Sequence, residues 1–413
     1  LEDAFTKEKL SGVLVGLYKT DNDSAFRLRQ PDYLTKTNQN GDFSFFYLAD
    51  GVYRIYALED ANYSYSFDQP NERIAFLDSL IIPAAKTTFD TIDSVFKTYY
   101  TPENLLLQMF QEENKRQYVL SSGRKVSGCL SVVLSLPKDD DIKWLSPDFS
   151  ADDVVLVKNE TRDSLRFYLN SSTLSEKDSL QMWITYNSRI DSIGYETDTL
   201  YFPLLEKTSE VLGLTDNLSQ NKLHYFQPLT VTADGLLSRI DTSQIYLFRQ
   251  VNDSVESPIE FSVNRSLSKH KFTFEAKFKE GEKYRLVLNR GAVSDVLNRL
   301  NDSISKVFTY RERDSYSSLS LNVQSENLGF FCQLLKGDEL VKQAYPDANG
   351  LVVFEFLEPN KYDVRLVFDK NKDKEWTSGN LEQKQQPEQV KYYPQKIELR
   401  ANWKQEIDWI LTQ

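Results

Sequence analysis

Residues 41–67 read GDFSFFYLADGVYRIYALEDANYSYSF, and residues 350–376 read GLVVFEFLEPNKYDVRLVFDKNKDKEW. Adding 309 to each residue number of the first stretch aligns it with the second without a gap. The identical pairs are Gly41 and Gly350, Phe45 and Phe354, Leu48 and Leu357, Tyr53 and Tyr362, Asp60 and Asp369, and Asn62 and Asn371. Most of these are core or turn residues, so the repeat predicts the same small β module near both ends of the chain.

The composition indicates a multidomain β protein. At 413 residues the chain is too long for one core, and this length predicts about two to four domains. Aromatic residues make up 13% of the chain, which favours strands because their side chains pack well on pleated surfaces. The formal net charge of −12 argues against a nucleic-acid binder, which needs Lys and Arg to neutralise phosphates. No run of 18 apolar residues is present, so no membrane-spanning helix is expected.

Strand-like runs separated by turn residues continue along the chain. They predict an all-β fold of tandem β-sandwich domains rather than βαβ units. The expected divisions are a β-sandwich over 1–93, a β-rich Ig-like domain over 94–206, a linker over 207–224, an Ig-like domain over 225–313 and a β-sandwich over 314–413. Residues 42–48 are expected to form a strand. Residues 94–110 hold the best helical patch, although its part 105–110 fits a strand equally well.

The repeat resembles the transthyretin-like, prealbumin-like sandwich, also known as the carboxypeptidase regulatory-like domain. The resemblance rests on G-x-F-x-F-x-x-L starting at Gly41, followed by G-V-Y-R starting at Gly51. The second copy departs from this pattern because it has Pro359-Asn360 where the first copy has Asp50-Gly51. The resemblance implies transthyretin-like sandwiches at both ends of the chain, with Ig-like domains between them.

The segment 225–313 resembles the bacterial Ig-like domain of the SbsA type. The matching residues are LLSRID from Leu236 to Asp241, then Gly281, Tyr284 and Leu286, then Gly291 and Asp295. The whole arrangement resembles the Ig-like-domain lipoproteins of Bacteroidota outer membranes, most particularly in the ending YYPQKIELRANWKQEIDW. This resemblance covers most of 1–93 and 225–413. It implies export, attachment to the outer membrane by a lipid on a Cys that would lie upstream of Leu1, and no known enzymatic activity.

A recurring tripeptide agrees with export. Asp-(Ser/Thr)-(Ala/Ile/Leu/Val) occurs ten times, whereas composition alone would give about two. Its hydroxyl residues are Ser24, Ser79, Thr91, Ser94, Ser164, Ser179, Ser192, Thr199, Ser254 and Ser303. The pattern resembles the Bacteroidota O-glycosylation sequon, which makes these residues candidate glycan sites. The alternative interpretation is structural, because Asp-Ser pairs form turns and would recur just before strands in any β protein.

One loop is a candidate cation site. Asp369, Asn371, Asp373 and Glu375 place oxygen side chains at alternate positions, and Ca²⁺ binds several converging oxygens of this kind. The loop is not an EF-hand, because the sixth and twelfth positions are Lys374 and Asn380 instead of Gly and Glu. The alternative is an Asx-turn loop, in which the same oxygens accept hydrogen bonds from nearby backbone. Ca²⁺ is the one cofactor that the sequence suggests.

Other chemistry-bearing residues give no recognisable catalytic pattern. His224 and His270 are the only histidines, and the sequence contains no nucleophile elbow, HExxH or P-loop. Cys129 and Cys332 lie too far apart in sequence for a metal-binding spacing. Three tryptophans (Trp376, Trp403 and Trp409) could line a sugar platform, although aromatic residues in a small sandwich are more often core. The acidic pair at Glu112 is expected to be solvated charge.

The sequence therefore predicts a non-enzymatic, exported lipoprotein of the outer membrane, on the cell surface or on the periplasmic face. Its expected role is that of a scaffold or interaction subunit whose partners are other outer-membrane or surface proteins. Two alternatives stay open at this point. One is a carbohydrate-binding surface protein that uses loop aromatics and Ca²⁺, and the other is an accessory domain array of a larger hydrolase.

Overall fold

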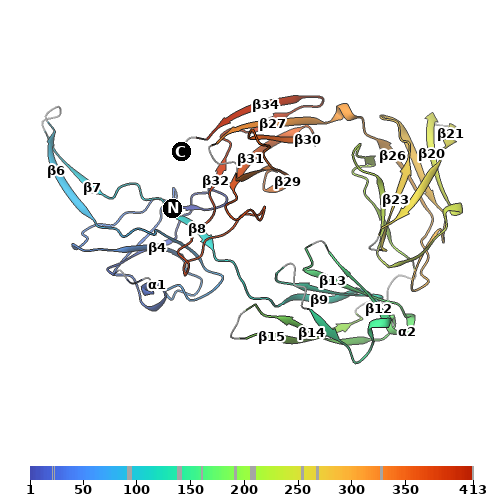
Figure 1. The fold of residues 1–413 in the computed structure, drawn as a ribbon, viewed down its shortest axis with the longest axis horizontal. Helices are drawn as coiled ribbons and strands as arrows, with labels where there is room; N and C mark the ends of the chain where they lie inside the picture. The colour runs from blue at the N-terminus through green and yellow to red at the C-terminus, as the bar shows by residue number, and fades with distance from the viewer. Residues whose placement is uncertain are drawn as a thin grey trace. The chain divides into compact units, whose positions relative to one another are not determined.

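The computed structural model divides the chain into two compact units. Unit 1 consists of Leu1–Asn114 and Tyr316–Gln413, and unit 2 consists of Lys115–Ser315. Strands dominate both units, and the two α-helices are short (Figure 1). The described residues are 1–411 without 21, 23, 91–94, 137–141, 160, 190–192, 205–210, 253–254, 267–268 and 326–328. The two copies of the repeat thus belong to one unit, although 309 residues separate them in sequence.

The first copy is built on a single six-stranded sheet. In spatial order its strands are β1 (Glu2–Asp3), β8 (Gln108–Gln111), β5 (Arg73–Phe76), β4 (Arg54–Glu59), β2 (Leu14–Tyr18) and β3 (Tyr33–Lys36). The short helix α1 (Ala25–Leu28) lies in the connection between β2 and β3. A separate hairpin, β6 (Ala84–Asp90) and β7 (Val95–Thr101), pairs with no other strand of the described chain and extends away from this sheet (Figure 1).

Both faces of this sheet are buried, which explains why four successive residues of β4 are buried. One face carries a cluster that includes Val15, Ile55, Ala57, Ala75 and Met109, covered by Leu1, Leu10, Phe43, Phe45 and Leu48. The opposite face carries Tyr18, Tyr56, Leu58, Ile74, Phe76 and Phe110, covered by Phe26 of α1, by Phe67 and by two residues of the second copy, Trp376 and Leu381.

The second copy is a two-sheet sandwich. One sheet has the order β30 (Leu351–Leu357), β27 (Ser317–Gln324), β34 (Lys404–Ile410). The other has the order β29 (Glu339–Ala344), β28 (Phe330–Lys336), β31 (Asn360–Phe368), β32 (Val390–Tyr392), with β33 (Ile397–Leu399) also paired to β31. Alternate residues of β27 and β30 point inward, as expected for strands with one buried face, and close a core that includes Trp409.

Backbone conformation confirms the register of the repeat. Three pairs of residues that are 309 positions apart all have positive φ: Tyr47 and Phe356 (57° and 55°), Tyr63 and Lys372 (62° and 63°), and Tyr65 and Lys374 (59° and 71°). A non-glycine residue rarely adopts such a φ, so three matches are strong evidence for a common backbone. A tyrosine hydroxyl also donates to the carbonyl four residues earlier in both copies, from Tyr53 to Ala49 (2.6 Å) and from Tyr362 to Glu358 (2.7 Å).

Strand pairing shows where the two copies differ in length. Val15 and Thr35 pair across β2 and β3 as Cys332 and Ala344 do across β28 and β29. Val15 and Cys332 are 317 positions apart, whereas Thr35 and Ala344 are 309 positions apart. The first copy therefore has eight more residues between β2 and β3, the connection that contains α1. Conversely, β5 and β32 are offset by 316, since Ala75 pairs with Ala57 and Lys391 with Leu366. The second copy therefore has seven more residues between β31 and β32.

Unit 2 contains two β-sandwich modules. The first has the sheets β12 (Val154–Lys158), β13 (Ser164–Leu169), β10 (Cys129–Leu134), β9 (Val119–Val126) and β11 (Lys143–Leu145), β14 (Ser179–Asn187), β15 (Tyr195–Pro203), with helix α2 (Ser172–Ser175). The second module has three sheets. The first sheet has the order β16 (Leu214–Asp216), β18 (Leu229–Ala233), β23 (Lys271–Ala276), β22 (Phe261–Arg265), and the second has the order β17 (Lys222–Leu223), β26 (Ile304–Tyr310), β24 (Lys283–Leu288), β20 (Ile245–Asn252), β21 (Val255–Pro258). The third is the pair β19 (Leu237–Ile240) and β25 (Val293–Asp295). Each module has its own hydrophobic core.

The structure confirms the all-β class, with β-sandwiches in the second copy and in both modules of unit 2. The first copy has one sheet where the sequence predicted a sandwich, and several other details are corrected. The first module extends beyond residue 93, because β8 pairs with β1 and β5. The expected linker 207–224 contributes β16 and β17 to the second module of unit 2, since Leu212 and Leu223 are buried in its core. The expected helical patch forms the strands β7 and β8 instead. Residues 42–48 form no strand, because no strand in the described part of the chain pairs with them.

Candidate functional site

The candidate cation loop of the second copy is held together by hydrogen bonds within itself. The two carboxylate oxygens of Asp369 accept from the amides of Asp373 and Lys374, both at 3.1 Å. The amide of Glu375 donates to Oδ1 of Asp373 (2.8 Å), and Nδ2 of Asn371 donates to Oδ2 of Asp373 (2.8 Å). Asp369 is 9% exposed, so its charge is stabilised mainly by these amides.

A buried glutamate closes the base of the same loop. Glu388 is 3% exposed and accepts from the amides of Lys370 (2.6 Å) and Thr377 (3.0 Å). Its backbone carbonyl accepts from the indole nitrogen of Trp376 (2.9 Å). The loop is thus tied to β32 through one carboxylate, which the sequence pattern around Asp369 does not reveal.

The first copy builds the equivalent loop with the same parts. Asp60 accepts from the amides of Asn62 (3.2 Å), Ser64 (3.2 Å) and Tyr65 (3.0 Å). Glu72 is 1% exposed and is the counterpart of Glu388, because the offset of 316 that relates β5 to β32 also relates these two residues. It accepts from the amides of Ala61, Asp68 and Gln69, at 3.1 to 3.2 Å.

These contacts match the Asx-turn alternative for the loop. The calcium site at Asp369, Asn371, Asp373 and Glu375 stays a prediction, and a bound cation would have to compete with the amides for the Asp369 oxygens. In the part of the chain that the structure describes, no group of three His, Cys, Asp or Glu residues is arranged to hold a metal ion. Calorimetric titration of Ca²⁺ into the wild type and into Asp373→Ala tests the site. Heat that the variant loses would establish it, and no heat in the wild type would end it.

The seven extra residues of the second copy make the contact with the first copy. The backbone amide of Leu381 donates to Oε1 of Glu112 (2.6 Å), and Nε2 of Gln386 donates to the carbonyl of Phe76 (3.1 Å). Gly379 lies against the ring of Phe110, where an added Cβ would come within 2.5 Å of ring carbon. Glu112 is therefore part of a joint between the copies and not the solvated charge expected from the sequence. We call this region, residues 376–388 with their first-copy contacts, the inter-copy joint.

Aromatic stacking extends the inter-copy joint to the beginning of the chain. The rings of Phe5 and Trp376 lie 4.8 Å apart between centroids. The guanidinium of Arg365 lies 3.7 Å from the centroid of the Phe5 ring and donates to Oε1 of Gln333 (2.6 Å). Arg365 is 8% exposed, so these contacts stabilise a buried positive charge. Sequence comparison of the copies misses this role, since Arg365 replaces Tyr56 at the equivalent position.

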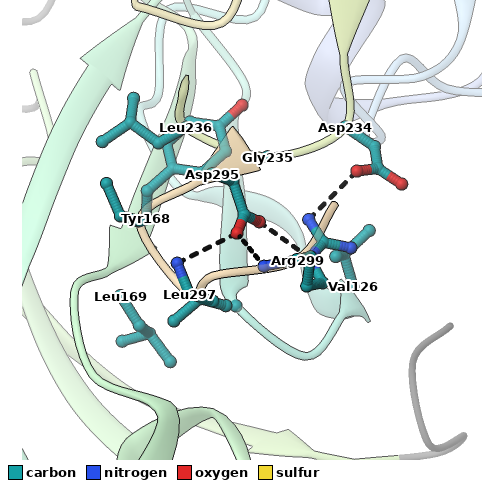
Figure 2. Close-up of a pocket in the computed structure, with 11 residues that line it drawn as sticks. Val126, Tyr168, Leu169, Asp234, Gly235, Leu236, Asp295, Leu297 and Arg299 are labelled. Carbon is teal, nitrogen blue, oxygen red and sulfur yellow. Dashed lines mark hydrogen bonds and ion pairs between the residues drawn. The ribbon is translucent and has the colours of Figure 1, made fainter. Parts of the chain in front are cut away.

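A small hollow in unit 2 is lined by strand ends and loops of both of its modules (Figure 2). The carboxylate of Asp295, which is fully buried, accepts from the amides of Leu297 (3.0 Å) and Arg299 (2.9 Å) and from Nε of Arg299 (2.7 Å). Arg299 also donates to Asp234 (3.0 Å). The hollow has a volume of about 10 Å³, which is room for about one water molecule. Asp295 therefore stabilises the loop 295–299 by accepting hydrogen bonds from its amides and by forming an ion pair with Arg299.

The cysteines and histidines occupy structural positions. Both cysteines are free, with Cys129 in unit 2 and Cys332 in unit 1. Burial raises the pKa of the Cys129 thiol to about 11 and that of Cys332 to about 12, so both stay protonated at neutral pH and are poor nucleophiles. Both histidines are partly buried, and the His224 ring stacks on Phe226 with 5.4 Å between centroids.

The candidate glycan residues differ in exposure. Ser79, Ser179, Thr199 and Ser303 are exposed, Ser24 and Ser164 are partly buried, and Thr91, Ser94, Ser192 and Ser254 lie outside the described residues. Ser164 and Ser179 are the first residues of β13 and β14, and Ser303 comes directly before β26. This placement agrees with the turn-forming interpretation, while glycosylation stays a prediction.

Aromatic side chains are exposed on the hairpin β6–β7 rather than at the tryptophans. Trp409 is 6% exposed in the core, Trp376 is partly buried in the inter-copy joint, and only Trp403 of the three is exposed. On the hairpin the exposed fractions are 52% for Phe89, 75% for Phe96, 51% for Tyr99 and 63% for Tyr100. The rings of Phe89 and Phe96 contact each other across the two strands, with 5.1 Å between centroids. The hairpin is thus a candidate interaction surface that the sequence pattern did not single out.

Comparison with solved structures returns arrays of small domains. A native alpha-2-macroglobulin of Escherichia coli, spanning domains MG0-NIE-MG1, is 13% identical over 69% of this chain and 97% of that one, with a TM-score of 0.23. Domains 1–6 of the surface layer protein SbsC are 11% identical over 70% of this chain and 41% of that one, with a TM-score of 0.27. Tandem Ig repeats of Dlar are 12% identical over 48% and 98%, with a TM-score of 0.18. No protein-family model and no curated protein sequence matches the chain. Because these scores are low, the fold class rests on the strand pairing described above.

In the part of the chain that the structure describes, no helix is long and apolar enough to cross a membrane.

Proposed function

We propose that the protein is an exported, non-enzymatic scaffold that binds other proteins of the outer membrane or cell surface, and that a lipid anchors it there. The observation that carries the proposal is the hairpin β6–β7, which exposes Phe89, Phe96, Tyr99 and Tyr100. Clustered exposed aromatics are typical of protein interaction sites, since they bury a large area with few rotatable bonds. The location and the anchor rest on the resemblance to Bacteroidota lipoproteins.

The connectivity of the units supports a scaffold. The chain leaves unit 1 after Asn114 and returns to it at Tyr316, so unit 2 is joined to unit 1 at both of its ends. The two arms of unit 1 are held together by the inter-copy joint, which combines the hydrogen bonds of Leu381 and Gln386 with apolar packing. This connectivity suits a protein that carries several interaction modules on one chain.

Pull-down of the tagged full chain from solubilised outer membranes tests the proposal. We expect stoichiometric recovery of a membrane or surface protein, and at least a ten-fold lower yield from Phe96→Ser, because exposed aromatic anchors commonly supply about 2 kcal/mol or more. Thr98→Ser is the matched control on the same strand, since Thr98 is exposed and its hydroxyl partner Thr87 can be kept. Equal recovery by Phe96→Ser would remove the hairpin from the proposal. Binding to glycan arrays without any protein partner would favour the carbohydrate-binding alternative.

A further inference from the structure

Among the residues that the structure describes, the first copy has no strand that corresponds to β27. In the second copy, β27 pairs antiparallel with β30 and parallel with β34. The counterpart of β30 is residues 42–48, which form no strand, and no hydrogen bond joins the backbone of residues 43–48 to another described residue. Ile81 bridges Tyr53 just as Ile397 of β33 pairs with Tyr362, and β6 follows Ile81 along the chain as β34 follows β33. Of the strands in the described chain, β6 pairs only with β7.

Leu1 marks where this missing strand ends. The nitrogen of Val323, near the end of β27, donates to the carbonyl of Gly350 (3.1 Å). The nitrogen of Leu1 donates to the carbonyl of Gly41, the counterpart of Gly350, at 2.6 Å. The Leu1 side chain is 6% exposed and packs in the first-copy core, as Val323 packs in the second-copy core. Leu1 is therefore the structural counterpart of Val323.

The exposed side chains beside residues 43–48 agree with a missing neighbour. Tyr47 is fully exposed, whereas its counterpart Phe356 packs edge-on against Tyr316 with 6.1 Å between ring centroids. Tyr316 directly precedes β27, and no described residue of the first copy occupies the equivalent position. Phe46 is also exposed, at 73%. An unpaired extended segment with exposed aromatic residues is a ready acceptor for a further strand.

We propose that residues 43–48 are a strand-acceptor site, and that its occupant is an extended segment joined directly to Leu1. The pairing of β27 with β30 gives the expected register. The residue before Leu1 corresponds to Asn322 and lies opposite Asp42. The added strand runs antiparallel to residues 43–48. The residues that correspond to Leu319 and Leu321 point into the core, because these two are buried in the second copy. The occupant therefore has apolar side chains at alternate positions and completes the first copy as a two-sheet sandwich.

A graft of the second copy's own strand tests this assignment in the full chain. The sequence of residues 316–322, YSSLSLN, is added directly before Leu1, and hydrogen exchange is followed at the amides of residues 43–48. We expect exchange there to slow by about ten-fold or more, because ladder hydrogen bonds protect amides that are now open to water. The matched control is the graft YSSDSDN, in which the two inward leucines are replaced by aspartate, and it should give no protection. The melting temperature should rise with the first graft only.

Three outcomes would overturn the proposal. Equal exchange in the leucine and aspartate grafts would show that no inward-facing strand forms. Protection of residues 43–48 in the ungrafted chain would show that another part of the protein already covers them. Protection by the free peptide YSSLSLN but not by the graft would show that the site takes a strand from another molecule instead of one joined to Leu1.

Discussion

The two copies of the repeat share a sheet and a loop but differ in what covers the sheet. The second copy closes its core with the second sheet β30-β27-β34, whereas the first copy covers the equivalent face with Leu1, Leu10 and residues 43–48. On the opposite faces the two copies meet each other, with Trp376 packed against the first copy and Phe5 against the second. The difference shows that the same repeat can be a complete sandwich or one sheet that depends on its surroundings.

Each copy also has its own insertion. Both insertions lie on the faces at which the two copies contact each other. The first copy adds α1, whose Phe26 stacks on Tyr56 with 4.4 Å between ring centroids. The second copy adds the segment that brings Leu381 into the same cluster. An insertion that buries apolar surface stabilises a contact that the unmodified repeat could not make alone. The inter-copy joint therefore owes its specificity to the residues that the copies do not share.

Phe26→Ala should lower the free energy of unfolding more than the other substitutions described below. Phe26 is 2% exposed and has no counterpart in the second copy, so its truncation leaves a cavity on the first copy alone. We expect the free energy of unfolding to fall by about 3–4 kcal/mol, with faster hydrogen exchange in β4 and unchanged exchange in the core strand β27. Leu28→Ala, on the same helix but 78% exposed, is the control and should change stability by less than about 0.5 kcal/mol. Similar losses for both variants would contradict the assigned role of Phe26.

Glu388→Ala and Glu72→Ala should have the next largest effects, and they should be similar in the two copies. Each substitution leaves at least two partly buried backbone amides without their acceptor. We expect a loss of about 2–3 kcal/mol in the free energy of unfolding, measured by denaturant titration. Glu388→Gln and Glu72→Gln keep one acceptor oxygen and should lose less. Equal stability of the Gln and Ala variants would show that hydrogen bonds from the amides to these side chains do not stabilise the loops.

Leu381→Ala tests whether the inter-copy joint stabilises the first copy from outside it. Leu381 is 9% exposed and contacts the first-copy cluster, so its truncation should cost about 2 kcal/mol. Hydrogen exchange should speed up in β5 and β8, although the substitution lies in the second copy. Glu382→Ala changes an exposed neighbour and serves as the control. Faster exchange confined to the substituted loop would show that the copies are stable independently.

Asp347→Asn should have the smallest effect, and only in acid. Asp347 accepts from the amides of Leu351 and Asn349 (2.9 and 2.8 Å), and these hydrogen bonds lower the pKa of its carboxyl below the ordinary value. A lowered folded-state pKa stabilises the fold above the unfolded pKa, and that stability is lost as the pH falls through the folded pKa. Asn38 accepts the equivalent amides in the first copy and does not titrate. The variant should therefore flatten the acid limb of the stability curve, measured by thermal melts between about pH 2 and 5. An unchanged acid limb would remove Asp347 as its cause.

Much of the fold could be predicted from local sequence. The repeat register, the all-β class and the turn chemistry of the Asp369 loop follow from residues whose conformational preferences act over a few positions. Glycine at Gly41 and Gly350 has φ of 75° and 84°, which other residues rarely adopt. Asp60 and Asp369 capture amides two to five residues away, so the same local pattern gives the same loop in both copies.

Contacts between distant residues decided the rest. The sequence motif of residues 42–48 favours a strand, but a strand forms only beside a neighbour that shares its hydrogen bonds. No strand in the described part of the chain pairs with these residues. Glu112 and Trp376 are partly buried and Arg365 is buried in the inter-copy joint. This requires segments more than 250 residues apart in sequence to come together, as the pairing of Leu381 with Glu112 shows. Local propensity specifies turns and alternation, whereas burial and strand pairing are properties of the assembled chain.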